Sequence, residues 1–194
     1  MPERPYITIV SGLPRSGTSL MMQMIHAGGV PAVTDEIRTP DTDNPRGYFE
    51  FEKVKQIKND TSWLPEAVGR VVKMVHLLLL DLPGDYQYRV VFMRRKLEEV
   101  LKSQSVMLER QGKKGAALPP ATLMKMYQDQ IDKVLKWMGE RPNFQFVEVN
   151  YNELVQDPHA AAERLASFLN EGGSALNIEK MVGAVDPSLY RNRS

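Results

Sequence analysis

Residues 11–19, SGLPRSGTS, have the composition and spacing of a loop that binds an oxyanion. Two glycines are separated by four residues, as in the phosphate-binding pattern GxxxxGK[ST], but Thr18 stands where that pattern has its lysine. A glycine-rich turn that leads into a helix presents backbone N–H groups and the positive end of the helix dipole to an anion. Thr18 and Ser19 add hydroxyl donors, and Arg15 supplies a cation from within the loop. We therefore expect the loop to bind a phosphate-like group.

The loop follows an apolar run that is typical of a buried strand, and three later runs predict further strands. The four runs are YITIVSG (6–12), GRVVKMV (69–75), YRVVFM (88–93) and NFQFVEV (143–149). Helical patterns follow the first run, at 18–29, and the third, where apolar stripes begin at Leu97 and Leu123. A last helix follows Asp157 and Pro158, an acidic N-cap with proline in the first turn. This order predicts a three-layer α/β/α domain with a mostly parallel sheet, whose ligands bind at the carboxyl ends of the strands.

Length and composition restrict the class of protein. The 194 residues are 42% hydrophobic, which predicts a single domain spanning residues 1–194. Twenty-five basic and 24 acidic residues leave a net charge of +1, which argues against nucleic-acid binding through a broad basic surface. The chain has no cysteine, its longest apolar run, MVHLLLL, is too short for a membrane span, and MPERPYITIV does not resemble a secretory signal. We expect a soluble, cytoplasmic protein.

The segment LPRSGTSL (13–20) resembles the 5′-phosphosulfate-binding loop of sulfotransferases that use 3′-phosphoadenosine 5′-phosphosulfate (PAPS). In that family a lysine or arginine inside the loop replaces the lysine of the GxxxxGK[ST] pattern. The resemblance implies a sulfotransferase topology within the P-loop NTPase-like folds, of the kind found in bacterial members. It also implies that the cofactor contacts six loop residues: Pro14, Arg15, Ser16, Gly17, Thr18 and Ser19.

Two further segments resemble nucleotide-binding parts of the same family. In YRVVFMRRKLEEVLKSQ (88–104), an arginine at the end of a strand and a serine eight residues later would contact the 3′-phosphate, and this spacing selects Arg95 and Ser103. Without the resemblance, Arg94 and Ser105 are equally good candidates. In NYNELVQDP (150–158), the resemblance implies that Tyr151 contacts the adenine.

The C-terminus departs from the family pattern. The arginine-lysine-glycine run that usually closes over the 3′-phosphate is absent, and the chain ends VDPSLYRNRS. Arg191 or Arg193 could take its place, or these residues could form a frayed basic tail. Leu20 stands where many relatives have an aromatic residue that stacks on adenine.

Sulfuryl transfer to a hydroxyl or amine needs stabilisation of charge on the leaving phosphate, for which Arg15 and Lys73 are candidates, and a general base. Glu50, in NPRGYFEFE, resembles the catalytic glutamate of many bacterial and Golgi-type members. His76, in VVKMVHLLLLDLP, resembles the histidine of cytosolic members, but it follows the lysine by three residues instead of two. Because a one-residue shift in a strand reverses the side chain's face, we prefer Glu50 and place His76 second.

The sequence thus predicts a sulfotransferase that uses PAPS, releases 3′,5′-adenosine bisphosphate (PAP), needs no metal and modifies a small molecule or a glycan. One alternative is a Mg²⁺-dependent kinase or NTPase, in which LLLLD (77–81) is a Walker B strand and Asp81 holds the ion with Thr18 or Ser19. Another is a protein of the same fold that binds PAPS or PAP without catalysis. Irregular stretches at 34–50 and 110–122 could cover the active site.

Overall fold

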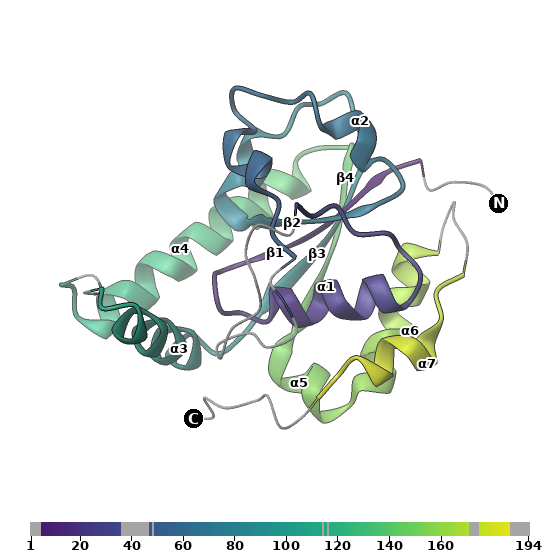
Figure 1. The fold of residues 1–194 in the computed structure, drawn as a ribbon. Helices are drawn as coiled ribbons and strands as arrows, with labels where there is room; N and C mark the ends of the chain where they lie inside the picture. Colours follow the sequence, from purple (N-terminus) through teal and green to yellow (C-terminus); the bar gives the residue numbers. More distant parts are fainter. Residues whose placement is uncertain are drawn as a thin grey trace.

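Four parallel strands form the centre of the fold (Figure 1). The computed structural model describes residues 5–35, 47, 49–113, 115, 117–170 and 175–186. The strands are β1 (Ile7–Gly12), β2 (Val71–Val75), β3 (Tyr88–Arg94) and β4 (Phe144–Asn150), in the order β2-β1-β3-β4. Each coincides with one of the four apolar runs, so the prediction of a parallel sheet is confirmed.

The helices fall into predicted and unpredicted groups. Four were predicted: α1 (Thr18–Ala27), α3 (Leu97–Arg110), α4 (Pro120–Gly139) and α6 (Pro158–Leu169). The others are short: 3₁₀-helix η1 (Glu52–Gln56), α2 (Leu64–Ala67), 3₁₀-helix η2 (His76–Asp81), α5 (Tyr151–Gln156) and α7 (Ile178–Gly183). Helices of four to six residues repeat their apolar face too few times to give a periodic signal. Among the described residues, no helix is long and apolar enough to cross a membrane.

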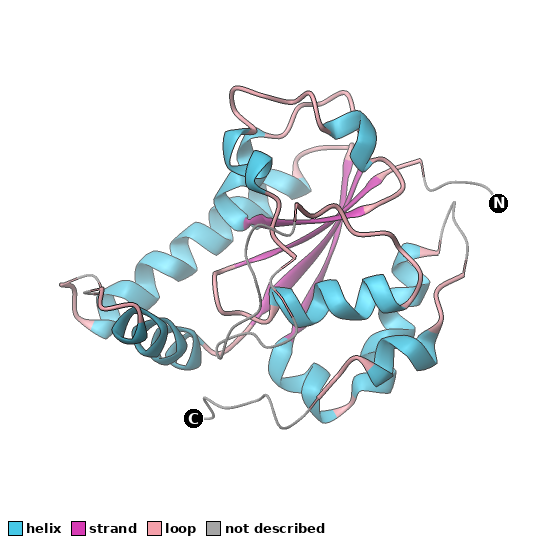
Figure 2. Ribbon diagram, viewed as in Figure 1, coloured by secondary structure: helices cyan, strands magenta, loops and turns pink. Residues whose placement is uncertain are grey.

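Helices cover both faces of the sheet (Figure 2), which confirms the three-layer α/β/α architecture. Side chains of β1 alternate between the two faces: Ile9 contributes to a core with α2, α3, α4 and the 3₁₀-helices. Val10 contributes to a second core with α1, α5, α6 and α7. All six residues of β1 are buried, as expected for a strand between two others in a covered sheet.

The strand register brings the segments that carry the predicted site residues to one edge of the sheet. Gly12, the last residue of β1, is in register with Val75 of β2 and Met93 of β3. Arg94 of β3 is in register with Asn150 of β4. The carboxyl ends of the strands therefore lie together, and the SGLPRSGTS loop lies between the segments that follow β2 and β3.

The segment LLLLD is not a strand. Residues 76–81 form the 3₁₀-helix η2, and His76, Leu79 and Leu82 are buried while Leu77 is exposed. Burial at every third residue matches the three-residue turn of a 3₁₀-helix. Asp81 is exposed at the end of η2, so the interpretation of LLLLD as a Walker B strand is wrong.

Two side chains, one asparagine and one aspartate, cap the helices that follow β4. Asn150 Oδ1 accepts hydrogen bonds from the backbone N–H groups of Asn152 (2.9 Å) and Glu153 (3.3 Å), so α5 begins directly after the strand. Asp157 Oδ1 accepts from Ala160 N at 3.0 Å with Pro158 in the first turn, which confirms the predicted start of α6. The first cap sets the position of Tyr151 at the sheet edge.

Candidate active site

The loop between β1 and α1 has the geometry of an anion-binding turn. The first backbone hydrogen bond of α1 is from Met21 N to Gly17 O, at 3.1 Å. The N–H groups of Thr18, Ser19 and Leu20 therefore have no acceptor within the helix, and no side chain of the described residues caps this end. Ser16 Oγ is buried and has no hydrogen-bond partner in the described part of the chain. The turn thus offers several donors at the positive end of a helix dipole.

Two glycines are required by close contacts of the loop. A Cβ on Gly12 would lie 2.7 Å from the carbonyl oxygen of Met93 and 2.7 Å from Ser16 Oγ. A Cβ on Gly17 would lie 2.3 Å from Cδ2 of Tyr151, and Gly17 has a φ of 99°. The backbone of the loop therefore packs directly against Met93 in β3 and against Tyr151, the first residue of α5, and it comes too close to them for any residue with a Cβ.

Arg15 turns toward α3. Its backbone has a φ of 73°, which is uncommon for a residue with a side chain. Its Nε donates to Ser103 Oγ at 2.9 Å, and Ser103 is buried, whereas Ser105 is exposed and donates to the Lys102 carbonyl. The structure therefore brings Ser103 to the loop and leaves Ser105 on the outside of α3. Gln104 Nε2 also reaches the loop, donating to the Pro14 carbonyl at 3.0 Å.

Arg95 lies beside the loop in a buried network. Its Nη1 donates to the Arg15 carbonyl at 3.3 Å, and its Nε donates to Glu99 Oε2 at 2.8 Å. The guanidinium carbon is 4.5 Å from the centroid of the Tyr151 ring, in cation–π geometry. The second oxygen of Glu99 accepts from Asn152 Nδ2 at 3.0 Å. The network ties the end of β3, the loop and α5 to one another.

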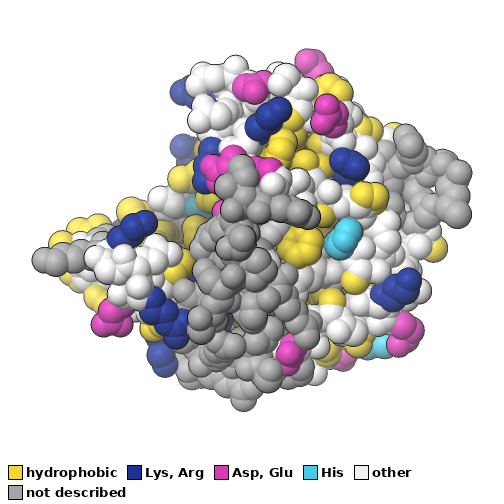
Figure 3. Space-filling view, in the orientation of Figure 1, with side chains coloured by type: hydrophobic (Ala, Val, Ile, Leu, Met, Phe, Trp, Pro, Cys, Tyr) yellow, Lys and Arg dark blue, Asp and Glu magenta, His cyan; other side chains and the backbone are white. Residues whose placement is uncertain are grey.

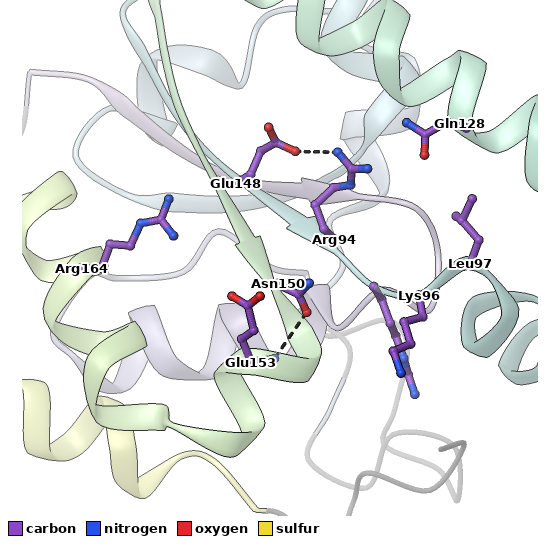
Figure 4. A pocket seen from close by; sticks show the side chains of 9 residues that line it. Arg94, Lys96, Leu97, Gln128, Glu148, Asn150, Glu153 and Arg164 are labelled. Carbon is purple, nitrogen blue, oxygen red and sulfur yellow. Dashed lines mark hydrogen bonds and ion pairs between the residues drawn. The ribbon is translucent and has the colours of Figure 1, made fainter. Parts of the chain in front are cut away.

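The neighbouring Arg94 points elsewhere. Its Nη1 pairs with Glu148 Oε2 of β4 at 2.6 Å (Figure 4). Both residues line an open groove of about 410 Å³ at the carboxyl ends of β3 and β4, with Lys96, Gln128 of α4 and Arg164 of α6. Arg94 and Arg95 are adjacent in sequence, but only Arg95 contacts the loop through the hydrogen bonds described above.

Lys73 and Glu50 meet on the opposite side of the loop. Lys73 is on the same face of β2 as Val71, toward α1, and its Nζ lies 3.2 Å from Ser19 Oγ and 3.9 Å from Glu50 Oε1. The Glu50 carbonyl accepts from Thr34 Oγ1 (3.0 Å) and from Asp35 N (3.3 Å), which holds this residue beside β2. The Lys73 and Glu50 side chains are 16% and 27% exposed, so both are near the surface of the site but not fully solvated.

His76 contacts a different set of groups. Because β2 ends at Val75 and His76 begins η2, strand alternation does not decide where its side chain points. The ring is buried, and its Nε2 lies 3.0 Å from Gln130 Oε1 of α4. Burial lowers the pKa of His76 below its ordinary value, and hydrogen bonds with Gln130 and the Gly12 backbone act in the opposite direction.

This pKa shift predicts that His76 makes folding stability sensitive to acid. In the unfolded chain His76 titrates near its ordinary pKa of 6.5, and in the folded protein it titrates lower. Between these values the unfolded state binds more protons, so the contribution of His76 is complete above the unfolded pKa and is lost as the pH falls toward the folded pKa. Urea unfolding at about pH 7.5 and about pH 5.5 should show a smaller loss of stability for His76→Gln than for the parent. Equal losses would contradict the prediction.

Arg191 and Arg193 lie outside the described residues, as do most residues of the irregular stretch at 34–50. Sequence reasoning missed Glu99, Asn152 and Gln104, which join the loop to α3 and α5. Glu99 follows Arg95 by four residues, close to the start of the predicted helix, and this spacing was a usable signal for the first of them.

The site's charges are local. On the face shown in Figure 3, basic and acidic side chains lie side by side among the residues drawn in colour, with Lys and Arg gathered over α3. Within the described ranges, no group of three or more His, Asp or Glu side chains could hold a metal ion. A local site of this kind fits the net charge of +1.

Comparison with known proteins identifies the family. The model of the sulfotransferase family matches residues 49–172, which is more than half of the chain. The chain belongs to the sulfotransferase family. The match begins after residues 11–19, so it supports membership of the family independently of the motif in that loop. Among curated proteins, none matches the sequence significantly.

Solved structures share the fold of this sulfotransferase. The sulfotransferase domain from the curacin biosynthetic pathway matches with a TM-score of 0.51 at 16% identity, over 96% of this chain and 89% of that domain. The sulfotransferase domain from the Synechococcus PCC 7002 olefin synthase matches with a TM-score of 0.56 at 13% identity, over 97% of this chain and 87% of that domain. A sugar kinase from Janibacter sp. HTCC2649 matches at a TM-score of 0.45 and 12% identity, over 95% of this chain and 97% of the kinase, which is too weak a likeness to bear on function.

Proposed function

We propose that this sulfotransferase transfers a sulfuryl group from PAPS to a hydroxyl or amine acceptor and releases PAP. The observation that carries the proposal is that cations flank the anion-binding loop on both sides. Lys73 of β2 lies on one side, and Arg15 and Arg95 with Ser103 lie on the other. PAPS carries two separate anionic groups, the 5′-phosphosulfate and the 3′-phosphate, and such a ligand needs two cationic positions.

The groups present in the loop fit this donor. The open N–H groups of Thr18, Ser19 and Leu20 and the buried Ser16 Oγ are donors suited to the oxygens of a 5′-phosphosulfate. The close packing of Gly12 and Gly17 leaves the backbone of the turn without side chains that would screen these donors. Tyr151, whose ring packs against the Arg95 guanidinium, is the candidate for contact with the adenine.

We assign the chemistry to the Lys73 side of the loop. PAPS supplies the sulfuryl group, and the bond from sulfur to the 5′-phosphate oxygen breaks as the acceptor oxygen or nitrogen bonds to sulfur. Glu50 takes the acceptor's proton as general base, and Lys73, 3.9 Å from it, stabilises negative charge on the departing phosphate. Arg15 assists from within the loop. His76 is second choice as base because it is buried against Gln130.

The proposed acceptor is a small molecule or a glycan, and no metal takes part in the chemistry assigned to these residues. Cations that neutralise the leaving group can replace the role that Mg²⁺ has in phosphoryl transfer. The absence of cysteine from the sequence is consistent with the reducing cytoplasm, which we propose as the location.

Calorimetric titration tests the donor. The parent protein is titrated with PAP and with ATP, each with and without Mg²⁺, and Arg95→Ala is compared with the matched variant Arg94→Ala. We expect micromolar or tighter PAP binding that does not depend on Mg²⁺. Arg95→Ala should weaken PAP binding by at least about tenfold, because it removes charge-assisted hydrogen bonds, and Arg94→Ala by less than about threefold. Binding of ATP only with Mg²⁺, and no binding of PAP, would contradict the proposal.

A further inference from the structure

We infer that Glu99 is a positioning residue that holds Arg95 in the orientation in which it binds a 3′-phosphate. The inference rests on the proposed function for the identity of the ligand. Glu99 is on the first turn of α3, four residues after Arg95, and its carboxylate accepts Nε of Arg95 at 2.8 Å.

The contacts around Arg95 fix its guanidinium on two edges and one face. Glu99 holds the Nε edge, the Arg15 carbonyl accepts from Nη1 at 3.3 Å, and the ring of Tyr151 lies against the face at 4.5 Å. Glu99 is itself held, because its other oxygen accepts from Asn152 Nδ2 at 3.0 Å. The backbone N–H of Lys96 donates to Asn152 Oδ1 at 3.5 Å. The planar fork of Arg95 is therefore oriented before any ligand binds.

Burial makes this arrangement rigid. Glu99 has 0% exposure, and the Arg95 side chain has 8%. A carboxylate that is buried and loses its donors is left charged and unpaired in the protein interior at a large cost, so Glu99 stays with Arg95 Nε and Asn152 Nδ2. The start of α3 also favours a negative charge at this position. A group that is already fixed loses less conformational entropy on binding, which raises affinity.

Positioning and simple electrostatics predict opposite effects of removing the Glu99 charge. If only net charge mattered, the carboxylate would weaken attraction for a doubly charged phosphate, and Glu99→Gln would bind PAP more tightly. If Glu99 positions Arg95, the same change weakens binding. Glutamine has one acceptor oxygen, whereas Glu99 accepts from two donors, so one of the two hydrogen bonds is lost.

The test compares PAP with adenosine 5′-monophosphate (AMP), which lacks the 3′-phosphate. Both nucleotides are titrated calorimetrically into the parent, Glu99→Gln and Glu98→Gln; Glu98 is the adjacent residue and is exposed. We expect Glu99→Gln to weaken PAP binding by at least about tenfold and AMP binding by less than about twofold. Glu98→Gln should bind both nucleotides as the parent does. Unchanged or tighter PAP binding by Glu99→Gln would overturn the inference. So would an equal loss for PAP and AMP together with a lower unfolding midpoint, which indicates a structural role alone.

A second readout separates this inference from the proposed function. In the ligand-free protein, the Nε–H of Arg95 should give an NMR signal that exchanges slowly with water in the parent and in Glu98→Gln, but rapidly in Glu99→Gln. If the parent binds no PAP, the donor assignment fails, and this signal still decides whether Glu99 holds Arg95. Rapid exchange in the parent would show that Arg95 is not held.

Discussion

Replacing Glu50 with glutamine is expected to lower kcat by about 10²- to 10⁴-fold, the usual contribution of a general base. Glutamine keeps the size of the side chain and removes the group that accepts the proton. Because Glu50 lies on the Lys73 side of the loop, away from Arg95 and Ser103, PAP should bind Glu50→Gln nearly as it binds the parent. The measurements are turnover with an acceptor found by screening and calorimetric PAP binding.

The control for Glu50 is Glu52→Gln. Glu52 lies two residues away, is partly exposed, and pairs with Lys55 at 2.6 Å. Its replacement should leave kcat within about twofold, since exposed ion pairs contribute little. If Glu50→Gln keeps parental activity while His76→Gln loses it, the base is His76. If both keep it, neither residue is the base.

Replacing Gly17 with alanine is the second change with a large expected effect. The new Cβ would lie 2.3 Å from Cδ2 of Tyr151, and a φ of 99° is unfavourable for any side chain. The overlap can be relieved only by displacing Tyr151 or the loop, either of which disturbs Arg95 on the tyrosine ring. We expect PAP binding to fall by at least about 100-fold and the free energy of unfolding to fall by about 2–4 kcal/mol.

Gly29→Ala separates the effect of backbone strain from the effect of overlap with Tyr151. Gly29 has a φ of 115°, so alanine is strained there as well, but no other described residue has an atom within 4 Å of the added Cβ beyond Gly29's two chain neighbours. This variant should lose about 1–2 kcal/mol of stability in urea unfolding and keep parental PAP affinity. If Gly17→Ala binds PAP as tightly as Gly29→Ala does, the contact between Gly17 and Tyr151 does not matter for the site.

Much of the fold could be predicted because each strand is a short apolar run with punctuation at its ends. The position of the loop could be predicted for a related reason: its two glycines, which the structure shows in close contact with Met93 and Tyr151, mark the turn from β1 into α1. The short helices could not be predicted from the sequence. The run after Val75 remains apolar, and only burial at every third residue distinguishes the 3₁₀-helix η2 from a continued strand.

The site was less predictable where side-chain direction decides. Arg94 and Arg95 are identical in type and adjacent, and their roles differ because one ends β3 facing Glu148 and the other turns toward the loop. Ser103 and Ser105 differ only by two positions on α3, which places them on different faces of the helix. From the sequence, Glu99 is expected to be an exposed charge on a helix, but the structure shows that it is buried.

The position of β1 between β2 and β3 has a consequence for folding kinetics. Thr8 of β1, for example, is in register with Val71 and Arg89, which are both distant in the chain. The sheet is therefore built from non-local contacts that form late in folding. Tyr151, which packs on Gly17, arrives with a still later segment. The proposed nucleotide site is therefore complete only when most of the chain has assembled. A nucleotide added during refolding would therefore stabilise the folded molecules by mass action. It would not speed the folding steps that come before the site is complete.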